Sequence, residues 1–276
     1  MADSQDVERL DLTSVLKSTH QDLRSKIREG GNFDEVWNEH LMNSTQRHMY
    51  ADSMKTLATV FWQEPPERCR FHWILLNLDE HLRNKKLIRF IEKDWRRHCF
   101  INNIECSPID FTGKQWCKDL YNFDKILPID LTPATETVLQ CDFVSVSLTD
   151  FVPFPLHNVV TELPLGQFDI IVLSLFLSYI PCPKARWRCV YKSHRLLKMN
   201  GILLIATPDS CSVYKSAPVM RHWREEIEAV GFRRFKYDKL NHLHCVGFRK
   251  IRSTPEELST CTQCLYLRTE YKNINQ

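Results

Sequence analysis

Apolar residues recur at helical spacing through the first hundred residues of the chain. Gly30-Gly31 interrupts this pattern where a helix end is expected, and Pro65-Pro66 breaks it a second time. The predicted helices cover 13–29, a segment that begins at Asn32, 50–61 and 71–100. We therefore predict an α-helical module over residues 1–103.

The pattern changes after residue 104, where short apolar runs alternate with amphipathic helices. The run 167–179 is almost continuously apolar, as is typical of a strand buried on both faces. Strands are predicted over 125–130, 167–179, 202–207, 232–237 and 243–248, and helices over 185–199 and 222–230. This order predicts an open, mostly parallel α/β sheet over 104–255, which would bind ligands at the carboxyl ends of its strands. The polar residues 256–276 predict a loose C-terminal tail.

The composition is that of a folded protein and not of a chain that coats nucleic acid. Hydrophobic residues make up 43% and aromatic residues 11% of the 276 residues, which is enough to fill a core. The 37 Lys and Arg residues nearly balance 34 Asp and Glu residues, whereas a nucleic-acid track needs clustered excess base. Glycine is scarce, at seven residues where an average content of about 7% would give roughly nineteen. A glycine-rich cofactor loop would have to draw on these few.

Most of the eleven cysteines are predicted to be reduced thiols of a cytosolic or nuclear protein. Residues 1–12 are polar and acidic where a secretory signal would be apolar. The longest apolar run, 170–180, is shorter than the ~18 residues that span a membrane, so we expect no membrane association. Cys261-Thr-Gln-Cys264 is the only CxxC string, and no second ligand pair lies at a convincing zinc spacing. No metal site is predicted.

One acidic side chain ends a short predicted strand, and a second lies twelve residues further along the chain. Asp130 comes directly after the strand, where a carboxylate can accept hydrogen bonds from both ribose hydroxyls of a nucleoside cofactor. A helix cap or a turn acid is the alternative. Asp142 and Phe143 follow, an acid that can bind an adenine amino group and a ring that can cover the base. A strand-end turn followed by a core phenylalanine is the alternative for this pair.

Polar residues also interrupt the next two strands. Ser174 and Ser178 lie within the apolar run near its carboxyl end, where they need hydrogen-bond partners in a ligand or in neighbouring backbone. The string 207–210, Thr-Pro-Asp-Ser, ends the following strand. The convergence of these residues on strand ends favours an adenosyl-type ligand, whereas Walker, Gly-x-Ser-x-Gly and His-Glu-x-x-His motifs are absent from the sequence.

Two blocks of the sequence contain specific strings. They comprise 20–30, 33–40, 50–58 and Trp62 in the first block, and Phe168-Asp-Ile-Ile-Val-Leu-Ser-Leu-Phe-Leu-Ser-Tyr-Ile-Pro-Cys-Pro183, Arg186-Trp187 and Asn200-Gly-Ile-Leu-Leu-Ile-Ala-Thr-Pro-Asp-Ser210 in the second. Gly231-Phe-Arg-Arg-Phe-Lys-Tyr237 and Phe248-Arg-Lys250 follow in order. These blocks resemble the SAMTOR family, the S-adenosylmethionine sensors upstream of TOR complex 1, and their fungal relatives, the 25S ribosomal RNA adenine-N1 methyltransferases.

The resemblance implies a class I, Rossmann-like methyltransferase fold preceded by an α-helical module. It also implies S-adenosylmethionine as the ligand, with S-adenosylhomocysteine competing for the same site. Asp130 is then the ribose acid, Asp142 and Phe143 are the adenine contacts, and Ser174 lies near the methionine part. Arg70 resembles an arginine of the helical module that reaches over the cofactor, and a guanidinium suits a ligand that carries a carboxylate. No residue is assigned a catalytic role.

Two functions follow from the resemblance. The first is a sensor that inhibits TOR complex 1 through the GATOR and KICSTOR complexes when it is free of ligand. Such a sensor would be cytoplasmic, and its partners could recruit it to the lysosome surface. The alternative is an S-adenosylmethionine-dependent methyltransferase acting on adenine N1 of ribosomal RNA, with RNA as its partner and a nucleolar location.

One part of the family pattern is absent from this chain. The family carries a strand that ends in Asp-Val-Gly-Ser, and its glycine lets the backbone approach the cofactor. The residues between Glu92 and Asp130 contain no such string, and no apolar strand precedes Gly113 there. A scaffold that binds neither ligand nor RNA is therefore a third hypothesis.

Overall fold

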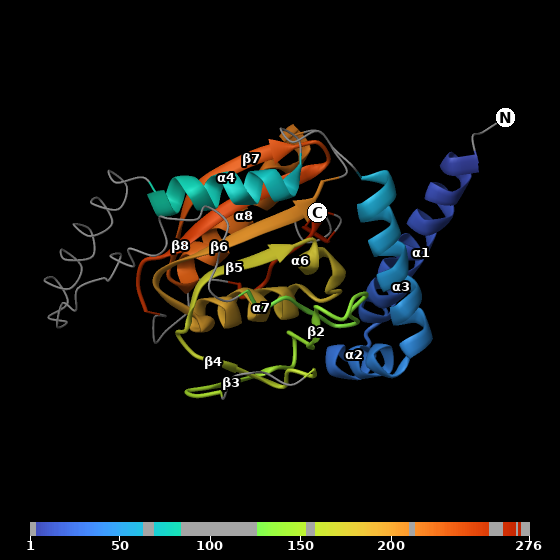
Figure 1. The fold of residues 1–276 in the computed structure, drawn as a ribbon, viewed down its shortest axis with the longest axis horizontal. Coiled ribbons are helices and arrows are strands. Elements are labelled where there is room, and N and C mark those ends of the chain that lie inside the picture. Colours follow the sequence, from blue (N-terminus) through green and yellow to red (C-terminus); the bar gives the residue numbers. More distant parts are fainter. Residues whose placement is uncertain are drawn as a thin grey trace, which may run out of the picture.

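The computed structural model describes residues 4–62, 69–83, 126–152, 158–209, 213–253, 262–268 and 270–271. These residues form an N-terminal group of helices and an α/β domain (Figure 1). The domain boundary predicted at 103/104, Gly113 and Cys261 lie outside the described residues. Within those residues, the structure contains no helix that is both long and apolar enough to cross a membrane.

The N-terminal helices begin and end where local sequence dictates. They are α1 (Ser4–Arg28), α2 (Phe33–Met42), α3 (Ser44–Thr56) and the π-helical turn η1 (Leu57–Phe61). Gly30 follows α1 with a φ of 93°, a left-handed conformation that glycine adopts without strain. The Asn32 side chain accepts two backbone N–H groups and so starts α2, as predicted. The third helix begins earlier than predicted, because the Asn43 side chain accepts the N–H of Gln46.

A four-stranded sheet forms the centre of the α/β domain. Its strands lie in the order β5-β6-β8-β7, in which β5 and β6 are parallel and the last two neighbouring pairs are antiparallel. The elements are β5 (Phe168–Ser174), α6 (Phe176–Tyr179), α7 (Pro183–Leu196), β6 (Leu197–Pro208), α8 (Val213–Val230), β7 (Phe232–Leu240) and β8 (Leu243–Lys250). The predicted terminal hairpin is confirmed, whereas in this sheet of the described residues only the β5-β6 pair is parallel, fewer than the mostly parallel sheet predicted.

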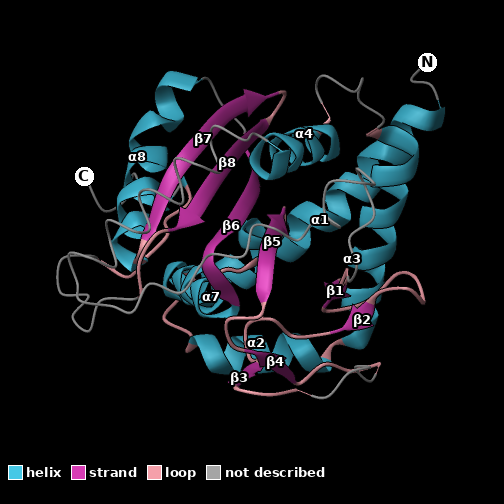
Figure 2. Cartoon of the chain, turned by 60° about the vertical axis from the view of Figure 1, so that its left-hand side comes forward, coloured by secondary structure: helices cyan, strands magenta, loops and turns pink. Residues whose placement is uncertain are grey.

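Two short parallel pairs precede this sheet. They are β1 (Ile129–Asp130) with β2 (Leu139–Gln140), and β3 (Ser147–Thr149) with β4 (Glu162–Pro164). Figure 2 shows β1 and β2 near α3 and set apart from β5. Within the described residues, the acid-bearing strand ends of β1 and β2 therefore belong to a separate small sheet.

Helices cover both faces of the central sheet because alternate residues of β6 point to opposite sides. Leu203 and Ile205 pack in the cluster that contains α7 and α8, whereas Ile202 and Leu204 pack against α4 (Arg70–Arg83). Figure 1 shows α4 lying across the sheet. The sequence places this helix in the helical module. The structure places it on the sheet, because its apolar residues meet those of β6 and β8.

Strand β5 is shorter and less buried than its sequence predicts. It ends at Ser174, because Leu175 has a φ of 62° and turns the chain into α6. Ser178 therefore lies in α6 and not in a strand, and its hydroxyl donates to the Leu175 carbonyl at 2.8 Å. Val172 is 40% exposed, because no strand of the described residues pairs with the outer edge of β5.

The thiols described by the structure fall into two groups. Cys141, Cys189 and Cys245 are buried, and burial raises the pKa of each to about 12. Cys69 and Cys182 are partly exposed. Cys264 is buried as well, and all six of these described cysteines are free thiols.

Gly231, between α8 and β7, provides a test of how closely this turn packs against α7 and the residues that follow β8. Its φ is 119°, and a Cβ atom there would lie 2.9 Å from both the Arg252 carbonyl oxygen and His194 Nε2. We predict that Gly231→Ala lowers the free energy of unfolding by about 3 kcal/mol, from steric overlap added to the left-handed backbone. Gly166→Ala is the matched control, because Gly166 has a φ of 60° and open space around it, and should cost about 1 kcal/mol. Urea unfolding measures both, and equal losses would contradict the steric argument.

Candidate functional site

The helical module consists in the structure of α1, α2, α3 and η1. It lies at the carboxyl ends of strands β5 and β6 (Figure 1). Its side chains reach the loops that follow β1, β2 and β5. Four donate hydrogen bonds there: Trp37 Nε1 to Asp142 Oδ2 at 3.0 Å, Arg24 Nη2 to the Ser178 carbonyl at 2.5 Å, Arg47 Nη1 to Thr132 Oγ1 at 2.9 Å, and Lys55 Nζ to the Ala134 carbonyl at 3.1 Å. The module thus covers the edge of the domain at which α/β folds bind ligands.

An aromatic cluster forms the centre of this junction. Tyr179 of α6 hydrogen-bonds His40 Nε2 through its hydroxyl, and its ring lies 4.8 Å from that of Tyr50, centroid to centroid. His20 in turn lies 2.9 Å from the Tyr50 hydroxyl, measured from Nε2. Burial raises the pKa of both tyrosines, and the nearby charge of Asp130 contributes in the same direction. Helices α1, α2 and α3 therefore meet α6 through neutral, mutually hydrogen-bonded rings.

Asp130 lies at the end of β1 beside this cluster. Its Oδ1 accepts the backbone N–H of Thr132 at 2.8 Å, and its side chain is exposed to solvent. The surrounding protein nevertheless raises the pKa of Asp130 by partly desolvating the carboxylate. Oδ2 forms no hydrogen bond with the described residues and remains available as an acceptor.

Asp142 and Phe143 have protein partners. Asp142 Oδ1 accepts the Val144 N–H at 3.0 Å, while Oδ2 accepts the Trp37 indole described above. Phe143 is buried in the main core, where its ring meets Phe176 edge to face. These contacts agree with the structural alternative considered for the pair, a turn acid and a core ring. They leave little of Phe143 to cover a base.

Arg70 and Ser174 are brought together across the sheet face. Arg70 Nε donates to Ser174 Oγ at 3.2 Å, although the residues come from α4 and from the end of β5. Burial lowers the pKa of Arg70, but a guanidinium keeps its charge at neutral pH. Leu175, the next residue, has the left-handed backbone that marks many functional turns. A cation and a hydroxyl thus meet at the carboxyl end of the strand.

The predicted site residues therefore form two groups. Asp130 and Asp142 lie next to each other through the parallel pairing of β1 with β2, in which the Cys141 N–H donates to the Asp130 carbonyl at 2.8 Å. Arg70 and Ser174 form the second group. No hydrogen bond between described residues joins the two groups. Both groups lie at strand ends on the edge that the module covers.

Sequence reasoning did not assign Trp37, His40, Arg24 and Tyr179 to the junction. Both Trp37 and His40 are buried residues of α2. Their partners are more than a hundred residues distant, so no local pattern reveals them. The available signal was chemical, because an indole and an imidazole on an otherwise apolar helix face both need hydrogen-bond partners when buried.

The donor set fits S-adenosylmethionine in part. The free oxygen of Asp130 suits a ribose hydroxyl, and the Arg70 guanidinium suits the ligand's carboxylate. The described glycines are Gly30, Gly31, Gly166, Gly201, Gly231 and Gly247, and none lies at the carboxyl end of β1, β2, β5 or β6. The close backbone approach that a glycine allows is therefore not provided by the described residues.

An α/β sheet with helices on both faces and a helical module over its carboxyl edge is the architecture of a methyltransferase-like protein. Residues 109–273 match the family model described as 25S rRNA (adenine(2142)-N(1))-methyltransferase, Bmt2. The chain is 35% identical over 282 residues to the S-adenosylmethionine sensor upstream of mTORC1 of Danio rerio, which covers 90% of this chain and 72% of the relative. The Xenopus tropicalis protein of the same name is 36% identical over 284 residues, covering 89% and 71%. The chain therefore belongs to the family that this model and these two relatives represent.

A comparison of structures adds little to this assignment. A T. thermophilus 16S rRNA methyltransferase in complex with AdoMet and guanosine aligns with 35% of this chain and 25% of its own, at 16% identity and a TM-score of 0.26. A score this low supports no argument. The fold class therefore rests on the family match and on the observed arrangement of helices and sheet.

From the buried histidines of the junction, we predict that acid lowers the free energy of unfolding. Burial, aided by nearby Arg24 and Arg186, lowers the pKa of His20 to about 4, and burial with Arg47 and Lys26 lowers that of His40 to about 4. The unfolded chain takes up protons below pH 6.5, whereas the folded junction does so only near pH 4. The free energy of unfolding therefore falls as the pH decreases through this window.

Thermal melts between about pH 7 and pH 4.5 measure this effect. His20→Gln should reduce the dependence of the melting temperature on pH. His48→Gln, which removes an exposed imidazole of α3, is the control and should leave the dependence unchanged. If both variants behave alike, the junction histidines are not its source.

Proposed function

We propose that this protein binds S-adenosylmethionine between the helical module and the carboxyl edge of the α/β domain, and that it acts as a sensor of that ligand. The observation that supports the proposal is the direct contact of the module with three strand-end loops, through Trp37, Arg24 and Arg47. A ligand at this edge would touch residues that also hold the module. Its binding would therefore change how the module docks.

The proposed contacts follow the chemistry of the side chains. Asp130 would accept the ribose hydroxyls through its free oxygen, and Arg70 would pair with the carboxylate of the methionine part. Ser174, already beside Arg70, would lie near the same part. Asp142 would reach the adenine amino group only through a lone pair not used by Trp37 or Val144. Phe143 would contribute at most an edge of its ring.

The sensing step follows from linkage between two binding events. If ligand and protein partner each prefer a different docking of the module, each weakens the binding of the other by the same factor. We propose that the ligand-free form binds the GATOR and KICSTOR complexes and inhibits TOR complex 1, in the cytoplasm or at the lysosome surface. S-adenosylhomocysteine would compete, because it retains the nucleoside and amino-acid groups that these residues recognise.

The alternative is an S-adenosylmethionine-dependent methyltransferase of ribosomal RNA adenine N1. The description of the matching family model favours it. Against it stands the near-balanced charge of the chain. A flipped adenine would need an open, basic and aromatic-lined pocket. We therefore rank the sensor first.

Asp130→Ala tests the ribose contact. We predict that it weakens S-adenosylmethionine binding by at least about ten-fold, the loss expected for a charge-assisted hydrogen bond, while the melting temperature stays close to that of the parent. Asp150→Ala removes an exposed acid that directly follows β3, outside both groups of candidate residues, and should leave the affinity unchanged. Calorimetric titration of the full chain measures both variants.

The same titration separates the three functions. Binding without methyl transfer to ribosomal RNA supports the sensor, and methyl transfer supports the enzyme. Absence of binding to the parent protein leaves the scaffold as the remaining function. Unchanged affinity in Asp130→Ala would refute the ribose assignment alone.

A further inference from the structure

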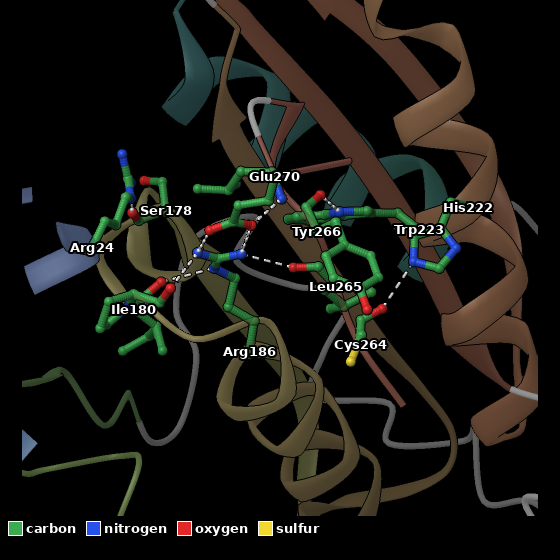
Figure 3. A network of polar contacts seen from close by, with 12 residues as sticks. Arg24, Ser178, Ile180, Arg186, His222, Trp223, Cys264, Leu265, Tyr266 and Glu270 are labelled. Atoms are coloured by element: carbon green, nitrogen blue, oxygen red, sulfur yellow. Dashed lines mark hydrogen bonds and ion pairs between the residues drawn. The ribbon is translucent and has the colours of Figure 1, made fainter. Parts of the chain in front are cut away.

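The C-terminal segment, residues 262–268 and 270–271, packs between α7 and α8. Its backbone is held by side chains and backbone of both helices, as Figure 3 shows for several of these contacts. Trp223 Nε1 donates to the Tyr266 carbonyl at 2.8 Å, and the Leu265 N–H donates to the Pro183 carbonyl at 3.0 Å. Leu265 is completely buried. The sequence predicts a loose tail here, and the structure instead makes this segment part of the domain.

Arg186 of α7 connects this segment to the rest of the molecule. Its side chain is completely buried, and its guanidinium uses every N–H group it has. Nε donates to the Ile180 carbonyl at 2.7 Å, Nη1 to the Leu265 carbonyl at 2.8 Å and to Glu270 Oε2 at 2.6 Å, and Nη2 to the Pro181 carbonyl at 3.1 Å and to Glu270 Oε1 at 2.8 Å. Among the described residues, Glu270 is the only carboxylate that contacts this buried cation.

The carbonyls of Ile180 and Pro181 come directly after α6, the helix that the module contacts. We call residues 176–181 the α6 turn. On one side of the turn, the Ile180 carbonyl accepts a hydrogen bond from Arg186. On the other side, the Ser178 carbonyl accepts a hydrogen bond from Arg24 of α1. Ile180 itself packs against Trp37 of α2. The C-terminal segment and the helical module therefore hold opposite sides of one short turn (Figure 3).

The charges of the junction are close enough to interact. Arg186 lowers the pKa of Arg24, and Glu270 raises it, in addition to the effect of burial. Removing the Glu270 charge would leave Arg186 buried without a counter-ion, which is strongly unfavourable. Arg186 would then have to turn toward water, and the two carbonyls of the α6 turn would lose their donors.

We propose that Glu270 is a positioning residue that acts through Arg186: the docked C-terminal segment fixes the α6 turn in the shape onto which the helical module closes. Docking of the segment and docking of the module are then coupled, although they make no hydrogen bond to each other among the described residues. The coupling does not depend on S-adenosylmethionine. It makes the C-terminal segment a second place from which the module can be released.

Hydrogen exchange of the full chain tests this proposal. Glu270→Gln keeps the size of the side chain and removes its charge. We expect it to speed amide exchange about ten-fold in α2 and in the α6 turn, while amides of β6 and β8 exchange at nearly the parent rate. Glu225→Gln, which removes an exposed acid of α8, is the matched control and should change neither. Trp37→Phe, which removes the indole donor to Asp142, shows what a loosened module looks like.

Two further variants keep the test decisive. Glu270→Asp retains the charge on a shorter side chain and should give an intermediate acceleration in α2. Arg24→Met loosens the module side, and because coupling is reciprocal it should speed exchange at the amides of 264–267. Release of the C-terminal segment with no change in α2 would overturn the proposal. So would equal acceleration in all elements, or no effect of Arg24→Met on 264–267.

Discussion

The left-handed backbone at Leu175 is the constraint on which the junction depends. It ends β5 and turns the chain immediately into α6, so that consecutive residues serve different neighbours. Ser174, before the turn, meets Arg70 from the sheet face, and Tyr179, after it, meets the aromatic residues of the module. The Leu175 N–H is held by the Ala206 carbonyl at 2.8 Å, which ties the turn to β6. A residue other than glycine is strained in this backbone conformation, and the surrounding contacts keep Leu175 in it.

The local features of the fold could be predicted from sequence, because they depend on neighbouring residues. The end of α1 at Gly30, the start of α2 at Asn32 and the antiparallel hairpin all follow from caps, breaks and periodicity. The position of α4 could not be predicted, because an amphipathic helix packs equally well on helices or on a sheet. The position of α4 depends on the apolar face of β6 and β8, which forms only in the folded chain.

The candidate site was predictable to the same limited degree. Strand ends identified Asp130 and Ser174, and in the structure these residues end β1 and β5. The partners of Asp142 and Arg186 could not be found this way, since Trp37 is 105 residues from the first and Glu270 is 84 from the second. The prediction of a loose tail does not hold for 262–268 and 270–271, because their partners in α7 are also distant in sequence. A polar sequence without period gives no sign that one of its acids neutralises a buried arginine.

The two groups of thiols have a practical consequence for chemical reactivity. Alkylating reagents attack the thiolate, and a pKa of about 12 leaves almost none of it at neutral pH for Cys141, Cys189 and Cys245. Cys182 is partly exposed and packs beside Trp37 and Ile180, at the end of the α6 turn. Its rate of labelling is thus a natural reporter for the junction. A fluorophore or spin label attached to Cys182, in a variant that lacks Cys69 and the cysteines outside the described residues, would record how the two parts of the molecule meet.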